Sequence, residues 1–262
     1  MSETFKICVL ASGSKGNCVY LKAGETECLI DAGLSCREIE KRLKAIGANA
    51  GTIRHIFMTH EHVDHIQGLP VFTKKYSVHV HMNQSMYLHA GSMVSKKTYI
   101  HLFEDAFTVD QLLVEPFSIL HDAIDPVGYC FHYQGKKASV LTDVGYATQL
   151  VKEKIKQSNV LILESNHDER LLMEGRYPWP LKQRIASRVG HLSNRQAAAL
   201  IQETIHPELK HIILAHLSEE NNRPSLAMET LYQHLTANAV TFSHIDIGLA
   251  HQHHVGDVVI VN

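Results

Sequence analysis

Six apolar, strand-like runs of this chain each lead directly into a histidine or a carboxylate. The residues that follow these runs are His60, His121, His216, Asp31, Asp143 and Glu164. In sheets that alternate with helices, ligand sites lie beyond the carboxyl ends of the strands. Any one of these residues alone could be a helix cap or a turn residue. Together they predict a layered α/β fold with a metal-binding rim at one edge.

The rest of the chain continues the alternation of strand and helix patterns. Strands are expected at 5–10, 18–22, 27–31, 55–59, 78–81, 112–120, 127–133, 138–142, 160–164 and 210–215. Helices are expected between Ser35 and Gly47 and at 148–157, 194–204 and 225–235. Ser35 with Glu38 and Ser193 with Gln196 predict capping boxes. No linker interrupts the pattern, so we expect a single domain over 1–262.

The composition is ordinary for a globular protein except for its histidines. Of 262 residues 20 are His, against 25 Lys plus Arg, and histidine serves chiefly as a metal ligand and proton carrier. A net charge of -2 supplies no global basic field, so an anionic partner must be held locally. The five cysteines form no C-x-x-C pair, and neither a signal peptide nor a membrane-spanning apolar run is recognised. We therefore expect a cytoplasmic protein with no membrane partner.

The strongest local signal is the stretch HEHVDH at 60–65. It places His60, His62, Asp64 and His65 directly after an apolar strand-like run. Two imidazoles two residues apart cannot share a helix face, but in a loop both can reach one ion while Asp64 and His65 reach another. The spacing therefore predicts two adjacent metal sites. A polar loop of surface histidines would explain neither the carboxylate nor its position at a strand end.

Six longer motifs identify a branch of one superfamily. They are SGSKGNC at 12–18, LIDAGLS at 29–35, HDAIDPVGY at 121–129, ESNHD at 164–168, GHLSN at 190–194 and LAHLSEENN at 214–222. With the histidine cluster, these motifs resemble those of the YycJ (WalJ) family of metallo-β-lactamase-fold proteins, over about residues 5 to 235. The resemblance implies a four-layer αβ/βα sandwich of two similar halves with metals at the edge between them. No long block separates the motifs, so no β-CASP insertion is expected.

The resemblance also implies ligands for two divalent metal ions. One ion is held by His60, His62 and His121, the other by Asp64, His65 and His216, and Asp143 bridges both. Such nitrogen and carboxylate ligands suit Zn, Mn or Fe(II) without choosing among them. Two ions about 3.5 to 4 Å apart can bind and deprotonate a shared water, so no protein nucleophile is needed. Asp64 is the expected proton acceptor, and Asp31 is expected to orient the imidazoles from behind.

Two loops are expected to contact the substrate. His191 and Ser193 precede the helix at 194–204, where free N–H groups favour an anion, and GHLSN resembles the G-H-x-S motif of β-CASP nucleases, whose histidine touches the scissile phosphate. A plain helix cap with a surface histidine is the alternative. Ser12, Ser14 and Asn17 form a glycine-flanked loop that could present N–H donors to the same phosphate.

A third loop follows the strand at 160–164. Glu164, Asn166 and His167 are expected to support the metal ligands or to contact substrate, with capping as the alternative for Asn166. Elsewhere Arg184, Arg188 and Arg195 are expected on solvated helix faces, and His79 and His81 on one face of a strand in a structural role.

The histidine cluster predicts a metal-dependent hydrolase without naming its substrate, because lactamases, thioesterases, sulfur dioxygenases and nucleases share it. Resemblance to YycJ proteins implies a 5′ to 3′ exonuclease acting on double-stranded DNA, with a link to mismatch repair. RNA as substrate stays open, as does the oligomeric state. The alternatives are a hydrolase of a small phosphodiester or thioester and a non-catalytic regulator of a cell-wall two-component system. The chain shows neither clamp device known in relatives, so DNA binding is expected to depend on the metals and a few local charges.

Overall fold

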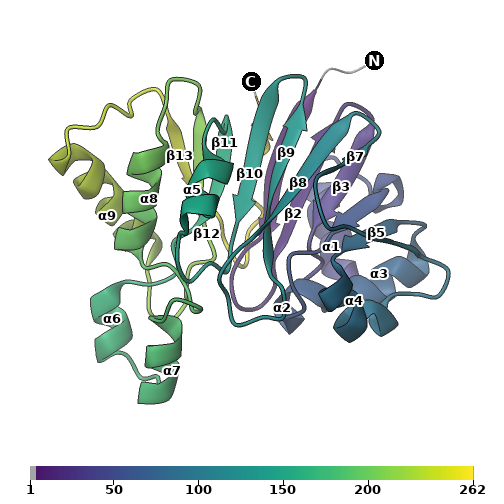
Figure 1. Cartoon of the computed structure of the whole chain (residues 1–262), viewed down its shortest axis with the longest axis horizontal. Coiled ribbons are helices and arrows are strands. Elements are labelled where there is room, and N and C mark those ends of the chain that lie inside the picture. The colour runs from purple at the N-terminus through teal and green to yellow at the C-terminus, as the bar shows by residue number, and fades with distance from the viewer. Residues whose placement is uncertain (1–3, 262) are drawn as a thin grey trace.

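The computed structural model describes residues 4–261, and within this range two seven-stranded sheets pack face to face (Figure 1). The first sheet has the order β14 (Val259–Ile260), β1 (Phe5–Ala11), β2 (Cys18–Ala23), β3 (Thr26–Ile30), β4 (His55–Phe57), β5 (His79–Met82) and β6 (Tyr99–Leu102). The second has the order β13 (Asp246–Leu249), β12 (His211–Ala215), β11 (Val160–Glu164), β10 (Lys136–Leu141), β9 (Val127–Tyr133), β8 (Leu112–Ser118) and β7 (Phe107–Val109).

Helices form the two outer layers. The first sheet is covered by α1 (Cys36–Ala45), α3 (Leu69–Lys75) and α4 (Gln84–Ala90), and the second by α5 (Gln149–Ile155), α8 (Asn194–Thr204) and α9 (Pro224–Ala237). Short 3-10 helices cover Ala50–Thr52 and Gly91–Met93. The helix α2 (Val63–Ile66) lies at the ends of the strands, while α6 (Glu169–Glu174) and α7 (Trp179–Ile185) project beyond the second sheet (Figure 1). This arrangement confirms the four-layer αβ/βα sandwich.

The core between the sheets is built from strand residues of both halves. Phe57 on β4 lies 5.5 Å from Phe131 and 6.0 Å from Tyr129, both on β9, measured between ring centroids. The Tyr129 hydroxyl donates to the carbonyl oxygen of Met58 at 2.6 Å, next to the histidine cluster. Burial of these apolar side chains supplies the main driving force for joining the two halves. None of the helices formed by residues 4–261 is long and apolar enough to cross a membrane.

The expected strands and helices are present, but the capping box at Ser35 differs and several short elements were not predicted. The box at Ser193 is complete, whereas at Ser35 only the side chain accepts from the Glu38 N–H, because the Glu38 carboxylate binds Arg42 instead. No strand was predicted at β6, β7, β13 or β14, and no helix was predicted at α2, α3, α4, α6 or α7. These helices are too short for the apolar periodicity of a helix to stand out in the sequence.

Candidate metal centre

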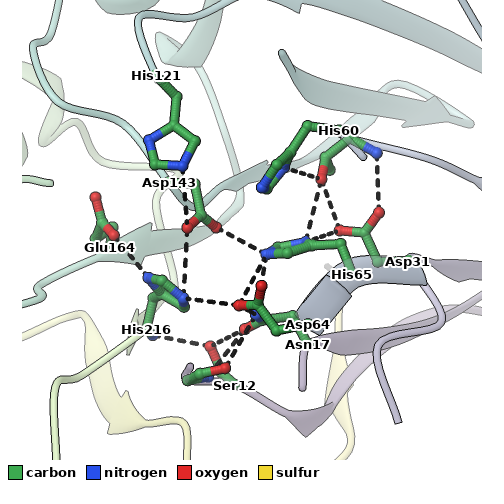
Figure 2. A network of polar contacts seen from close by, with 12 residues as sticks. Ser12, Asn17, Asp31, His60, Asp64, His65, His121, Asp143, Glu164 and His216 are labelled. Carbon is green, nitrogen blue, oxygen red and sulfur yellow. Dashed lines mark hydrogen bonds and ion pairs between the residues drawn. The ribbon is translucent and has the colours of Figure 1, made fainter. Parts of the chain in front are cut away.

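The predicted ligands converge where strands of both sheets end (Figure 2). The loop after β4 carries His60 and His62, and α2 carries Asp64 and His65. From the second half, His121, Asp143 and His216 follow β8, β10 and β12. The first half thus contributes one continuous segment and the second half contributes three separate strand ends.

These side chains form overlapping groups whose ligand atoms lie within 4.8 Å of one another. The groups are His60 with His62 and His121, Asp64 with His65 and His216, His60 with His65 and Asp143, and Asp143 with Glu164, His191 and His216. Asp143 lies between the first two groups. Its Oδ2 is 3.2 Å from His65 Nε2, and its Oδ1 is 3.4 Å from His216 Nε2 and 3.9 Å from His121 Nε2.

Three buried atoms of this cluster have no hydrogen-bond partner in the described part of the chain. They are His60 Nε2, His216 Nε2 and Asp143 Oδ2. Buried polar atoms without partners are rare in folded proteins and cost stability. A set of imidazole nitrogens and carboxylate oxygens also matches what zinc, manganese and iron prefer. The residues present therefore fit a divalent metal centre.

Three residues at strand ends have a strained backbone that directs their side chains toward the cluster. Asp31, Asp143 and His216 have φ values of 60, 57 and 54°. Such left-handed backbone is uncommon for residues other than glycine and costs about 1–3 kcal/mol in unfavourable cases. Close packing fixes α2 as well, because a Cβ on Gly33 would lie 1.7 Å from the carbonyl oxygen of Asp64.

Asp31 lies behind the cluster and holds the segment after β4. Its Oδ1 accepts from the Thr59 N–H and its Oδ2 from the Thr59 hydroxyl, each at 2.8 Å. The same Oδ2 lies 2.7 Å from His65 Nδ1. This contact leaves His65 Nε2 pointing toward Asp143 (Figure 2). Thr59 was not predicted as part of the site, although it stands directly before the histidine motif.

Glu164 orients histidines in the second half of the protein, as Asp31 orients His65 in the first half. It is fully buried, and its Oε1 lies 2.8 Å from both His191 Nδ1 and His216 Nδ1. Its Oε2 accepts from the N–H groups of Val144 and Leu192. Burial alone would raise the pKa of this carboxyl, but His191 and His216 outweigh it and lower the pKa to about 2. One charged carboxylate therefore orients two imidazoles.

The carboxylates divide the histidines into two electrostatic classes. Burial opposes protonation of His65, but Asp143 and Asp31 outweigh burial and raise its pKa to about 10. At His216, Asp143 likewise outweighs burial and raises the pKa of the imidazole well above its usual value. By contrast, burial and the neighbouring His65 lower the pKa of His60 well below its usual range. Metal binding requires neutral imidazoles, so binding at His65 and His216 releases protons.

The loop of residues 12–17 lies directly against the cluster. Asn17 Nδ2 donates to Asp64 Oδ2 at 3.1 Å and lies 3.0 Å from His65 Nε2. Ser12 Oγ accepts from the His216 N–H at 2.8 Å. Both side chains are buried, whereas Ser14 is exposed. Thus Ser12 and Asn17 contact the predicted ligands directly, and Ser14 alone of the three expected residues faces solvent.

The other expected substrate contacts are mostly buried. Ser193 caps α8 and its hydroxyl donates to Glu169 at 2.9 Å. Asn166 Nδ2 donates to the His216 carbonyl oxygen at 2.8 Å. His167 is 2% exposed, and its Nδ1 has no hydrogen-bond partner among the described residues. Burial lowers the pKa of His167 to about 4, so this imidazole is neutral at physiological pH.

Two buried amides that were not predicted join these loops. Asn194 Oδ1 accepts from Ser165 Oγ at 2.7 Å and from Asn222 Nδ2 at 2.9 Å. Asn222 Nδ2 also donates to the carbonyl oxygens of Ser165 and Asn166. The amides therefore fix the segment after β11 against the start of α8. Both belong to recognised motifs, but the sequence does not say that their amides face each other.

His191 completes the cluster at its partly open side. Its side chain is 20% exposed, and its ring centroid lies 5.1 Å from that of His121 and 5.2 Å from that of His216. Burial opposes its protonation, but Glu164 outweighs burial and raises its pKa. Nδ1 faces Glu164, while Nε2 makes no hydrogen bond to any residue between 4 and 261. His191 thus places an available N–H beside the predicted ligands.

Comparison with known proteins agrees with this geometry. Residues 26–217 match the family described as "Beta-lactamase superfamily domain". The exodeoxyribonuclease YycJ of Bacillus anthracis is 41% identical over 229 residues, which are 86% of this chain and 87% of that protein. The exodeoxyribonuclease WalJ of Streptococcus pneumoniae strain D39 is 37% identical over 244 residues, 90% of each protein.

The fold also matches solved structures at low sequence identity. The metallo-β-lactamase fold protein YhfI of Bacillus subtilis superimposes with a TM-score of 0.74 at 14% identity, covering 99% of this chain and 100% of that one. The His/Asp cluster occupies the strand ends of this fold, as a metal-dependent hydrolase requires. The chain therefore belongs to the YycJ (WalJ) family of metallo-β-lactamase-fold hydrolases.

Proposed function

We propose that the protein is a 5′ to 3′ exonuclease that removes nucleotides from double-stranded DNA. Support comes from the names of its relatives, which are called exodeoxyribonucleases and share 37 to 41% of their aligned residues with it. The observation that carries the proposal is His191, a partly exposed imidazole with a raised pKa beside the ligand cluster. An N–H donor whose charged form is favoured at that place suits a phosphodiester better than a thioester.

The seven predicted ligands divide between two divalent ions in this proposal. His60, His62 and His121 would hold one ion, Asp64, His65 and His216 would hold the other, and Asp143 would be available to both. Zn, Mn and Fe(II) all suit these donors. Such ions supply Lewis-acid charge and lower the pKa of a water molecule when they are bound. Asp31 and Glu164 keep His65 and His216 in the orientation needed for binding.

The remaining chemistry falls to Asp64 and His191. His216, whose Nε2 lies 3.9 Å from Asp64 Oδ2, and His65 outweigh burial and lower the pKa of the Asp64 carboxyl, so Asp64 is ionised and can accept a hydrogen bond from the attacking water. Asn17 Nδ2 holds the Asp64 carboxylate in place at 3.1 Å. His191 donates from Nε2 to a phosphate oxygen and stabilises the negative charge that develops there. Glu164 outweighs burial and raises the pKa of His191, which favours the protonated ring for this role.

The setting of the reaction is part of the proposal. Because both halves supply ligands and share the core around Phe57 and Tyr129, we treat 1–262 as one domain. The five cysteines are buried free thiols, which suits the reducing cytoplasm. Removal of nucleotides from a DNA end is the step that mismatch repair needs after strand incision, so we place the enzyme in that pathway.

The test is digestion of matched end-labelled DNA and RNA, single-stranded and double-stranded, by metal-free protein resupplied with Mn²⁺ or Zn²⁺. We expect release of mononucleotides from the 5′ end of duplex DNA that depends on metal and is absent in His60→Ala. In His191→Ala, metal content should be retained while turnover falls by about 10²-fold, as for other single electrostatic donors. Turnover of a small phosphodiester or thioester with no digestion of any polymer would contradict the proposal.

A further inference from the structure

Residues 169–189, which we call the helical arm, form a two-helix projection inserted between the segments that carry Glu164 and His191. The arm begins five residues after Glu164 and ends two residues before His191. It contains α6 and α7, which extend beyond the second sheet (Figure 1). A substrate that reaches His191 therefore has this projection beside it.

The base of the arm is packed tightly against the cluster. His121 Nδ1 donates to the Gly190 carbonyl oxygen at 3.1 Å, and the Asp122 N–H donates to the Val189 carbonyl oxygen at 3.0 Å. A Cβ on Gly190 would lie 2.2 Å from the carbonyl oxygens of Arg184 and Ile185. Leu172 on α6 is fully buried. The arm thus has a fixed position relative to the predicted metal ligands.

The charge of the arm is opposite to that of the whole chain. It has five basic and two acidic residues, whereas the chain has 25 Lys plus Arg and 27 Asp plus Glu. The two acidic groups are engaged, Glu169 by the Ser193 hydroxyl and Glu174 by Arg170 at 3.4 Å. Lys182 is buried and donates to the Met173 carbonyl oxygen, which ties α7 to α6.

Four exposed arginines lie on the arm; besides Arg170, which pairs with Glu174, they are Arg176, Arg184 and Arg188. Arg184 forms an ion pair with Asp122, the neighbour of His121. The guanidinium of Arg188 lies 4.3 Å from the ring centroid of Tyr146, which follows Asp143 and is 42% exposed. Arg176 is exposed and makes no ion pair with any residue of 4–261.

The arm also exposes an indole. Trp179, at the start of α7, is 60% exposed, although a side chain of this size normally finds cover in a folded protein. Arginines interleaved with exposed aromatic rings are the usual means of holding a nucleic-acid strand, since the rings stack on bases while the charges neutralise phosphates. Arg184 and Arg188 were expected on solvated helix faces, but Arg188 lies in the turn after α7, and contacts with Asp122 and Tyr146 connect the two side chains to the metal centre.

We propose that the helical arm binds the DNA strand that leads into the metal centre, with its arginines on the phosphates and Trp179 stacked on a base of the frayed end. This inference rests on the proposed function, because it names the surface that holds the same substrate. It gives the chain a local basic surface that its overall charge of -2 does not supply.

The test compares the double variant Arg176→Ala/Trp179→Ala with wild type. Both residues lie away from the predicted ligands, and Arg37→Ala on α1 removes an exposed arginine from the far half as the matched control. Binding of a fluorescent duplex with a frayed 5′ end is followed by anisotropy in the metal-loaded His60→Ala background, where no digestion is expected. Digestion kinetics are measured in the otherwise unchanged proteins.

We expect the Kd for this duplex to rise by about 10-fold in the double variant, as loss of one stacking platform and one phosphate contact implies. The slope of log Kd against log salt should fall by about one, because one phosphate contact is lost. KM should rise in parallel while kcat stays within about twofold. Arg37→Ala should match wild type in all of these measurements.

If DNA affinity and the salt slope are unchanged in the double variant, the proposal that the arm binds DNA is wrong, whatever the digestion kinetics show. If wild type digests no DNA but the arm variant still loses affinity, the arm proposal stands and the exonuclease proposal falls. A larger loss of affinity for an RNA duplex than for DNA would overturn DNA as the strand that the arm binds.

Discussion

Two histidine clusters within residues 4–261 differ in their place in the fold and in the groups that surround them. One is the metal centre. The other, which we call the histidine ladder, consists of His55, His79, His81 and His101 on three parallel strands at the edge of the first sheet. It lines a cavity of about 530 Å³ together with Phe103 and Phe107. The ladder lies within strands, whereas the metal centre lies beyond the strand ends.

The ladder is a stack of rings in register. His55 pairs with His79 across β4 and β5, and His81 with His101 across β5 and β6. Ring centroids of these pairs lie 5.3 and 4.9 Å apart. His55 Nδ1 is 3.0 Å from His81 Nε2, and His79 Nδ1 is 2.8 Å from His101 Nε2. Each of these contacts requires at least one neutral ring, since two imidazolium groups have no acceptor nitrogen.

Carboxylates account for the difference between the clusters. No ladder histidine forms an ion pair with a carboxylate among residues 4–261, and burial followed by neighbouring histidines lowers the pKa of His81 to about 3. In the metal centre, Asp143 and Asp31 outweigh burial and raise the pKa of His65 to about 10. At His65 two carboxylates therefore outweigh burial, whereas burial prevails at His81, which has no carboxylate partner among residues 4–261.

The largest effect is expected when the carboxylate shared by both ligand groups is removed. Asp143→Asn keeps the shape of the side chain and deletes its charge beside His65 and His216. We expect the purified variant to lose most of its bound metal. Activity should fall by more than the roughly 10 to 100-fold that loss of an outer-shell partner costs. Metal content by mass spectrometry and DNA digestion at saturating Mn²⁺ measure these effects.

The matched control for this variant is Asp105→Asn, which removes an exposed carboxylate beside the ladder cavity. It should leave metal content and digestion at the wild-type level. Retention of the full metal complement by Asp143→Asn would show that this carboxylate is not the shared ligand.

The second prediction concerns the carboxylate behind His65. Asp31→Asn should weaken metal affinity and activity by about 10 to 100-fold. The amide has only one accepting oxygen, so it cannot accept from the His65 Nδ1–H and both Thr59 donors as the two carboxylate oxygens do. Excess metal should restore most of the activity, which a purely structural defect would not allow. Metal titration of digestion rate, with unfolding midpoints for both proteins, separates the two cases. Equal activation curves would show that Asp31 does not support metal binding.

The contrast between the clusters also explains what the sequence could predict. The ligands of the metal centre stand directly after apolar runs, so their convergence followed from the general geometry of strand ends. His79 and His81 were expected on one strand face because their spacing is two, and the structure confirms that expectation. Their partners His55 and His101 were not predicted, since His101 lies on β6, which has no clear sequence pattern.

Burial of individual polar side chains was harder to predict. Ser12, Asn17 and Ser193 occur in glycine-flanked or capping segments, which are usually at the surface, yet each is at most 4% exposed. Packing of distant segments covers them, since Gln252 from the C-terminal segment donates to the Gly16 carbonyl oxygen. Such contacts between positions far apart in sequence leave no local pattern.

The third and smallest prediction tests the neutral state of the ladder. His81 has a pKa of about 3 in the folded protein and the ordinary value of 6.5 when unfolded. Below pH 6.5 the unfolded chain therefore takes up a proton that the folded chain does not, so stability is lost as pH falls from about 6.5 toward about 3. Between pH 7 and pH 5 this group should contribute a loss of about 1 to 2 kcal/mol in the free energy of unfolding.

His81→Phe should remove that loss while preserving the stack on Phe57 and Phe107, whose ring centroids lie 4.8 and 5.2 Å from the imidazole. Urea unfolding of wild type and variant at both pH values isolates the contribution of His81, because titration of the metal centre is common to both proteins. His101→Phe, at the exposed end of the ladder, should change the pH dependence by less, since this residue is exposed whereas His81 is buried. Equal acid sensitivity of wild type and His81→Phe would mean that the ladder accepts protons freely, and the electrostatic contrast between the two clusters would then be lost.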